Sequence, residues 1–254
     1  MAYDFPNMPR DFYIEVSKGN VPGHEILVMS GGKSSINIAD APLDIWNYGG
    51  LHTYSSTADI DQLSSSDNSD DQIIEVDGLD SDWNRVIQQK TLTGQTPVNL
   101  DTPLIRVYSM YNKGTTDCAG DVYLSTNGAA LTLGVPDTPS TVRALIEGSA
   151  NLSSDCNFSV PVGYSAWLIA FFAGYYVSKA TGASFSFSFR EFGGVFKSIV
   201  PLAVIGSGTS TITHTFITPV FKFAEKTDIK TKCTNIESND TGLSAASYFL
   251  LVKD

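Results

Sequence analysis

Phe185-Ser186-Phe187-Ser188-Phe189 is the stretch that decides the fold. Phenylalanine and serine alternate strictly here, and successive side chains of an extended strand point to opposite faces of its sheet. The pattern therefore predicts a β-strand that presents three phenylalanines to a core and two hydroxyl groups to water.

Similar strand signals recur on both sides of this stretch. Short runs rich in β-branched and aromatic residues are bounded by turn residues at the ~8–12-residue spacing of sandwiches and barrels. These runs cover residues 73–76, 85–92, 104–111, 121–125, 195–200, 210–223, 228–234 and 246–252. No segment has the periodicity of a three-turn amphipathic helix. The sequence therefore predicts an all-β protein, an antiparallel β-sandwich or jelly roll with an extended N-terminal arm.

The division of the chain into parts is predicted from the residues that interrupt its strands. Residues 12–16 and 25–29 look like strands but stand among Gly, Pro and Asn. Residues 59–71 are polar and indicate a loop, and Pro136 and Pro139 mark an internal boundary. The predicted parts are an extended N-terminal arm at residues 1–58, a first β module at 59–138 and a second, jelly-roll-like β module at 139–254.

Charge and composition limit the classes of binding partner that we expect. The chain has 254 residues, 16 Lys and Arg against 27 Asp and Glu, and a formal net charge of −11. Such a field repels phosphate backbones and anionic lipid, so neither nucleic acid nor membrane is expected as a partner. The longest apolar run, 166–177, is too short to span a bilayer, and the start lacks the features of a secretory signal. We expect a soluble protein made in a cytoplasm.

Chemistry-bearing motifs are incomplete. Gly31-Gly32-Lys33-Ser34 lacks the upstream glycine of a phosphate-binding loop and predicts a plain turn. His24, His52 and His214 have no ligand at zinc-like spacing, and Asp67, Ser69 and Asp71 lack the glycine and glutamate of a calcium loop. Carboxylate pairs for glycoside hydrolysis converge only in three dimensions, so the sequence leaves that class open. We expect no enzyme, no cofactor and no metal.

Cysteines and aromatic residues give more local expectations. Cys118, Cys156 and Cys233 lie far apart and are odd in number, which predicts buried free thiols. Trp83 and Trp167 are expected in the core. Trp46, Tyr48 and Leu51 of the arm are interface candidates, and two interpretations stay open for the two aromatic residues. They either contact a neighbouring subunit or anchor the arm.

Several phrases at characteristic spacing resemble one family. They are DIWNYGG at 44–50, VDGLDSDWN at 76–84, LTG at 92–94, LIRV at 104–107, VPVGYSAWL at 160–168, FGGVF at 192–196, HTF at 214–216 and PVFKFAEKTDI at 219–229. The set resembles uncharacterised virion structural proteins of marine tailed phages, over roughly residues 19–254. The chain departs from the family pattern at 64–71 and 114–120, which are expected to be surface loops.

The resemblance implies a role in a virus particle. The implied protein is a capsid decoration or cement protein, a homotrimer that binds the major capsid protein and copies of itself on a virion assembled in the host cytoplasm. The family offers no catalytic residues. The alternative is a tail or head-fibre adhesin that binds host surface glycans through exposed aromatic residues, and a glycan-active hydrolase is a third hypothesis.

Overall fold

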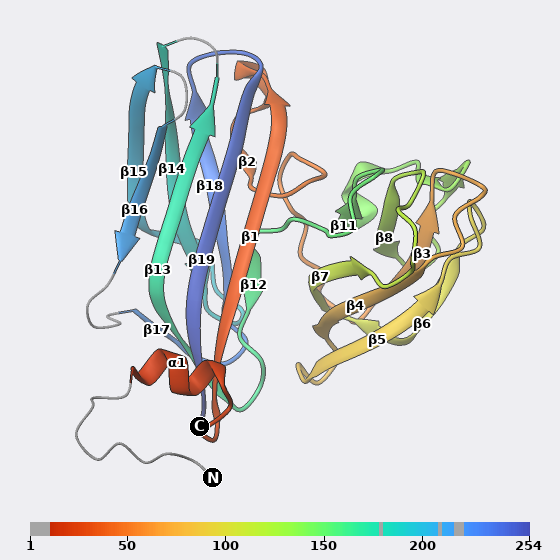
Figure 1. The fold of residues 1–254 in the computed structure, drawn as a ribbon, viewed down its shortest axis with the longest axis horizontal. Coiled ribbons are helices and arrows are strands. Elements are labelled where there is room, and N and C mark those ends of the chain that lie inside the picture. Colours follow the sequence, from red (N-terminus) through yellow and green to blue (C-terminus); the bar gives the residue numbers. More distant parts are fainter. Residues whose placement is uncertain (1–10, 178–179, 208–209, 216–220) are drawn as a thin grey trace.

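The computed structural model describes residues 11–177, 180–207, 210–215 and 221–254. These residues form an almost entirely antiparallel β structure in two parts (Figure 1). An elongated two-sheet body contains residues 24–44 and 157–253, and a smaller inserted module occupies residues 60–146 between them. The prediction of an all-β, antiparallel sandwich is confirmed.

The body consists of two facing sheets. The front sheet has the order β1-β19-β13-β16, with β17 also paired to β13, and the back sheet has the order β12-β18-β14-β15, with β2 also paired to β18. The front strands are β1 (His24–Ile36), β13 (Tyr164–Tyr176), β16 (Ser210–Thr215), β17 (Lys222–Phe223) and β19 (Thr241–Lys253). The back strands are β2 (Leu43–Asp44), β12 (Asn157–Ser159), β14 (Ala180–Arg190), β15 (Lys197–Ser207) and β18 (Asp228–Ile236).

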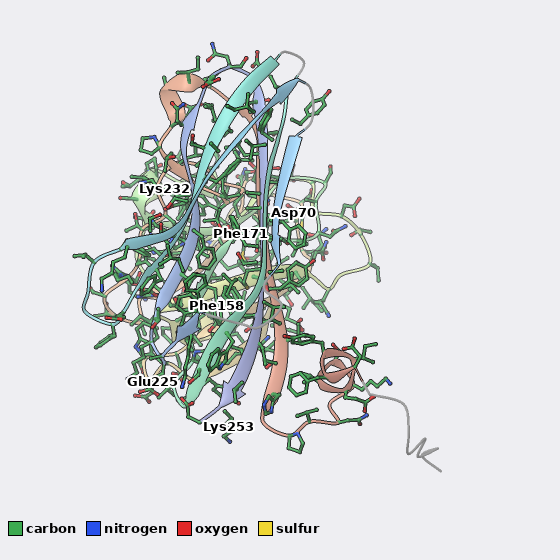
Figure 2. All side chains as sticks on the ribbon, turned by 90° about the vertical axis from the view of Figure 1, so that its left-hand side faces the viewer. Asp70, Phe158, Phe171, Glu225, Lys232 and Lys253 are labelled. Atoms are coloured by element: carbon green, nitrogen blue, oxygen red, sulfur yellow. The ribbon has the colours of Figure 1, made fainter. Side chains whose placement is uncertain are left out.

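Aromatic side chains fill the space between these sheets. Phe185 and Phe187 of β14 are 1% and 0% exposed, and Phe187 meets Phe171 of β13 with ring centroids 5.4 Å apart. Figure 2 shows Phe158 and Phe171 within this core. The predicted inward face of β14 is therefore confirmed.

The hydroxyl face of β14 differs from the prediction. Ser186 and Ser188 are only 8% and 7% exposed, although their side chains point away from the phenylalanines. Their Oγ atoms lie 2.9 Å apart, and Ser186 also donates to Ser198 Oγ at 2.8 Å. Their cross-strand neighbours Lys232 and Lys230 are much longer side chains. Short hydroxyl groups between long neighbours are shielded from water, so the expected wet face is wrong.

The inserted module contains a four-stranded sheet of order β11-β8-β3-β6, a three-stranded sheet of order β5-β4-β7 and a small hairpin of β9 and β10. The two sheets touch where β5 meets β6 and where β7 meets β11, and they enclose a separate core. The strands are β3 (Ile60–Ser65), β4 (Ile73–Leu79), β5 (Arg85–Thr91), β6 (Val98–Leu104), β7 (Arg106–Asn112), β8 (Val122–Thr126), β9 (Leu131–Thr132), β10 (Val135–Pro136) and β11 (Val142–Ile146). The predicted hairpin over residues 73–92 is confirmed as β4 and β5.

The arm and the domain boundaries need correction. Residues 24–36 form β1, which pairs with β19 from His24–Val252 to Ile36–Thr241, so this part of the predicted arm belongs to the body. Gly31 to Ser34 lie inside β1 and are not a turn. The boundary at residue 138 is also wrong, because β11 at 142–146 pairs with β8 of the inserted module.

Two local predictions were wrong for physical reasons that can be named. Residues 60–65, read as a loop, form the fully buried strand β3, in which Ser64 donates to Gly134 O and Ser65 donates to Asp70. Residues 12–16, read as a strand, belong to helix α1 (Phe12–Ser17), which is capped by the Asp11 carboxylate that accepts from Tyr13 N and Ile14 N. Two short 3-10 helices, Ile38–Asp40 and Pro139–Thr141, complete the elements.

The remaining predictions concern thiols, strands and membrane spans. Cys118, Cys156 and Cys233 are free and buried, as predicted. The predicted strand at 210–223 is present at 210–215 and 222–223, while its residues 216–220 lie outside the described part of the chain. Within the described residues, no helix combines the length and apolar character needed to cross a membrane.

Candidate functional site

The body and the inserted module meet at a buried ion-pair cluster, here called the seam. Arg106 at the start of β7 binds Asp228 at the start of β18, with Nε–Oδ1 and Nη2–Oδ2 distances of 2.7 Å and 3.0 Å. The two side chains are 8% and 4% exposed. Strand register places Arg190 of β14 and Ser159 of β12 on either side of Asp228, and both donate to its carboxylate. One carboxylate thus ties the two parts of the molecule together.

This environment decides the protonation of Asp228. Burial by itself would raise the pKa of the carboxyl group, but the hydrogen bond and positive charge of Arg106, with further donors from Ser159 and Arg190, lower it below its usual value. Asp228 is therefore a carboxylate at neutral pH. Its charge is compensated by two guanidinium groups, so the cluster is locally positive.

Tyr54 lies at the centre of the cations. Its ring centroid is 5.1 Å from the guanidinium carbon of Arg106, 4.9 Å from that of Arg190 and 5.8 Å from Lys230 Nζ. Lys230 is in turn paired with Asp44 at 2.8 Å. Burial raises the pKa of the Tyr54 phenol well above its ordinary value, so the ring stays neutral and offers its face to the cations.

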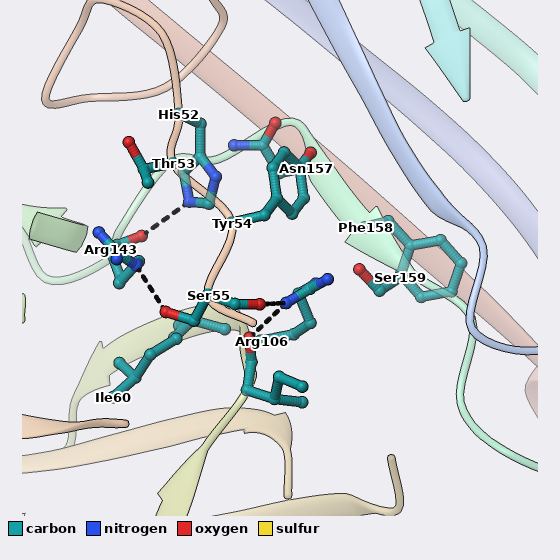
Figure 3. A pocket seen from close by; sticks show the side chains of 12 residues that line it. His52, Thr53, Tyr54, Ser55, Ile60, Arg106, Arg143, Asn157, Phe158 and Ser159 are labelled. Carbon is teal, nitrogen blue, oxygen red and sulfur yellow. Dashed lines mark hydrogen bonds between the residues drawn. The ribbon is translucent and has the colours of Figure 1, made fainter. Parts of the chain in front are cut away.

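A small cavity of about 10 Å³ lies behind this cluster and is lined by His52, Ser55, Arg143 and Asn157 among others (Figure 3). Burial lowers the pKa of His52 to about 3, so its imidazole is neutral, and its Nε2 lies 3.2 Å from Arg143 O. Ser55 Oγ accepts from Arg143 Nε at 3.1 Å. Among the hydrogen bonds of the described residues, none joins Ser55 to an imidazole.

An open groove of about 420 Å³ also borders the seam and shares Tyr54, Ser55 and Arg106 with the small cavity. Its walls include Trp83 and Phe192, whose rings meet edge to face with centroids 5.7 Å apart. Its charged lining is Arg106, Arg190 and Asp228. Trp83 is 4% exposed, which confirms its predicted core position, whereas Phe192 is 69% exposed. The groove combines an exposed aromatic ring with charged groups held in place.

The predicted interface residues lie near the seam. Trp46 is 2% exposed and packs on Tyr48 and His52, with ring centroids 5.4 Å and 4.8 Å away, and its indole N–H donates to Gly50 O at 3.1 Å. It also shares a small core with Tyr123, Val142 and Leu145 of the inserted module. The structure therefore places Trp46 inside its own subunit, where it anchors the segment between the body and the module. Leu51 is 54% exposed.

A second surface of interest is the outer face of the front sheet, defined by Ile26, Val28, Trp167, Phe172, Tyr248 and Leu250. Register aligns Val28 with Tyr248 and Ile26 with Leu250, which is paired with Trp167 on its other side. Val28, Phe172 and Tyr248 are 47%, 36% and 36% exposed, and the last two rings are in edge contact at 5.5 Å. Trp167, predicted in the core, is half-buried on this face.

The described residues contain no group of three or more His, Cys, Asp or Glu that could hold a metal ion. His52 is enclosed at the seam, and His24 packs edge to face against Phe12. The side chain of His214 lies outside the described part of the chain.

Sequence reasoning missed Tyr54, Arg106, Arg190 and Asp228 as a cluster. One signal was present, because Arg106 follows Leu104 and Ile105 at the start of a strand, and a charged side chain in an apolar stretch needs a buried partner. Nothing local indicated that the partner would be Asp228.

Comparisons with known proteins return no matching family model and no matching curated protein. Among solved structures, a Bacillus thuringiensis Cry1Da tryptic core variant has a TM-score of 0.22 and 8% identity over 70% of this chain, which spans about half (51%) of that chain. The infectious bursal disease virus Gt strain structure has a TM-score of 0.24 and 11% identity, covering 96% of this chain and 78% of that one. The VP2 subviral particle of the same virus has a TM-score of 0.21 and 9% identity, covering 91% and 72%. Likenesses this distant define neither a family nor a function.

Proposed function

We propose that the chain is a structural protein of a phage virion, a capsid decoration or cement protein that binds the shell through the outer face of its front sheet. The partners are the major capsid protein and further copies of the chain, arranged as a homotrimer. The observation that carries the proposal is the apolar area that Val28, Phe172 and Tyr248 expose on this face.

The physical argument starts from the rest of the surface. The chain carries a net charge of −11, yet Val28, Phe172 and Tyr248 expose apolar area on three adjacent strands of one sheet. Contiguous exposed apolar area on a soluble protein commonly marks an interaction site. Helix α1 lies on the same side at the foot of the sheet, and its Phe12 and Ile14 are 44% and 52% exposed (Figures 1 and 2). These residues extend the surface that a partner would cover.

The topology of the body supports the same role by analogy. Numbered along the chain, β1, β12, β13, β14, β15, β16, β18 and β19 lie in the orders 1-8-3-6 and 2-7-4-5 in the two sheets. We infer that this order is that of a jelly roll, an architecture that viral coat domains and lectins share. Fold alone does not assign a function, so the analogy adds to the argument from the face and does not replace it.

A test compares two charge insertions. Tyr248→Glu places a carboxylate at the centre of the outer face, and Ile87→Glu places one on β5 of the inserted module, where Ile87 is 57% exposed and serves as the matched control. We expect the first variant to lose co-sedimentation with particles of the encoding virus, and the second to keep it. Equal binding by both variants would contradict the proposal.

Copy number separates the decoration role from the alternative. Quantitative mass spectrometry of purified particles should find hundreds of copies of a decoration protein. A dozen or so copies would instead favour the tail or head-fibre adhesin, whose glycan-binding aromatic residues would have to be the exposed ones.

A further inference from the structure

The groove beside the seam contains a guanidinium group held in a fixed position. The guanidinium carbon of Arg190 lies 4.9 Å from the Tyr54 ring centroid and 4.8 Å from that of Phe196. Asp228 accepts from Nε and Nη2 of Arg190, while no hydrogen bond within the described residues uses Nη1. Arg190 therefore has one edge fixed to a carboxylate and a second edge with donors to offer. Its side chain is 27% exposed.

The charge around this edge favours an anion. Arg106 and Arg190 share the single carboxylate of Asp228, which leaves one positive charge uncompensated among the three. Lys226 Nζ lies 5.7 Å from the ring of Phe192, so a further cation stands at the rim. In a chain with a net charge of −11, this local excess is a specific feature of the groove. A planar guanidinium group suits an oxyanion, which can accept two of its hydrogen bonds.

The walls of the groove suit a small ring-shaped ligand. Phe192 is 69% exposed although its ring contacts that of Trp83 at right angles, so it offers aromatic surface to a ligand. Gly193, with a φ of +74°, adds no side chain to the groove, and a Cβ placed there would meet no atom within 4 Å, so the groove is open at this position. The groove volume of about 420 Å³ falls in the ~300–1,000 Å³ range of small-molecule sites.

We propose that this groove binds a pyranose that carries an oxyanion, either the carboxylate of an acidic sugar or a sulfate ester. Arg190 receives the oxyanion through Nη1, and Phe192 stacks on the apolar face of the sugar ring. The site does not depend on the virion role, because it lies at the seam and not on the outer face of the front sheet.

The experiment titrates the full chain with glucuronate, glucose 6-sulfate, glucose and inorganic sulfate, and follows tryptophan fluorescence and binding heat. Trp83 lines the groove and reports on its occupation. We expect at least one anionic sugar to bind at least tenfold more tightly than both glucose and inorganic sulfate. The preference between glucuronate and glucose 6-sulfate shows whether the oxyanion is a carboxylate or a sulfate ester. Equal binding of glucose, equal binding of inorganic sulfate, or no binding of either anionic sugar would overturn the proposal.

Substitutions inside and outside the groove test whether the sugar binds there. Arg190→Gln should weaken binding of the preferred sugar at least tenfold. Arg85→Gln is the matched control, since Arg85 also has a 27% exposed side chain, pairs with an aspartate and lies over a tyrosine ring. Phe192→Ala changes an exposed side chain and should weaken the same binding several-fold with an unchanged melting temperature. Loss of binding in Arg85→Gln, or full binding in both groove variants, would show that the sugar binds elsewhere.

Discussion

Asp228 and Asp155 are both buried aspartates near the junction of the two parts of the molecule, yet their surroundings differ. Asp228 accepts hydrogen bonds from two arginines and a serine. Asp155 is 5% exposed, and its Oδ1 has no hydrogen-bond partner in the described chain. Burial without compensation raises the pKa of Asp155 to about 8. The two residues should therefore respond oppositely to pH.

The first prediction concerns Asp155→Asn. The unfolded chain releases the Asp155 proton near pH ~4, whereas the folded chain holds it up to about pH 8. The unfolded state thus binds fewer protons in this interval, and the free energy of unfolding of the wild type falls as pH rises through it. The neutral asparagine removes this loss. We expect the variant to be more stable than the wild type by about 1–3 kcal/mol at pH 8, with the advantage shrinking toward pH ~4.

Urea denaturation of both proteins at pH 5 and pH 8 measures this difference. If the variant were equally destabilised at both pH values, Asp155 would act through its shape and hydrogen bonding and not through its proton.

At the scale of elements, strand β1 depends on a glycine for close packing. A Cβ at Gly31 would lie 2.4 Å from Ile45 O and 2.6 Å from Cys156 N, two groups that are hydrogen-bonded to each other at 2.9 Å. The chain segments that lead into and out of the inserted module therefore cross directly against β1. No larger residue fits there without moving backbone atoms.

Gly31→Ala is accordingly expected to lower the free energy of unfolding by about 2 kcal/mol or more. Gly242→Ala in the paired strand β19 is the control, because its added Cβ would meet Tyr176 atoms only at 3.8 Å and 3.9 Å. Chemical denaturation of the two variants gives the comparison. Similar stability of both would mean that β1 can shift away from the crossing segments.

The segment around Trp46 connects the body to the inserted module. Because Trp46 is 2% exposed and packs against Tyr123, Val142 and Leu145 of the inserted module, Trp46→Ala should cost about 3–5 kcal/mol of stability and leave the oligomeric mass unchanged. Leu51→Ala, at a 54% exposed position of the same segment, should change stability little. Light scattering and denaturation together test both statements. A drop in mass at unchanged stability would restore Trp46 as an interface residue.

At the scale of the whole molecule, the seam should make the two parts unfold as one. Separating them would take Arg106 of the inserted module away from Asp228 of the body, the buried ion pair that crosses the junction. Breaking a buried pair of this kind costs ~3–5 kcal/mol. We expect one calorimetric transition for the wild type, with equal calorimetric and van't Hoff enthalpies. Arg106→Met should lower its temperature or split it, and two separate transitions in the wild type would refute the coupling.

Features that depend on neighbouring residues were predictable from the sequence, and features that depend on remote residues were not. The hairpin of β4 and β5 was predictable because its two strands are neighbours in sequence. The burial of Phe185 and Phe187 was predictable because the alternation of Phe and Ser is visible within five residues. Strand β3 was not, since it is covered by pairing with β6 and β8, and Ser64 donates to Gly134 O, 70 positions away. The candidate site was missed for the same reason, because Arg106 and Asp228 lie 122 positions apart.

The sequence by itself determined the β class, the buried free cysteines and the acidic character of the molecule, because periodicity, residue type and charge are properties of single positions and short stretches. Only the tertiary structure decided that β1 pairs with β19 at the other end of the chain, that Trp46 lies inside its own subunit, and that a groove forms beside Asp228. The physical reason is that antiparallel partners and buried charges find one another across long loops. A strand pattern specifies which face is apolar, but not which remote segment covers it.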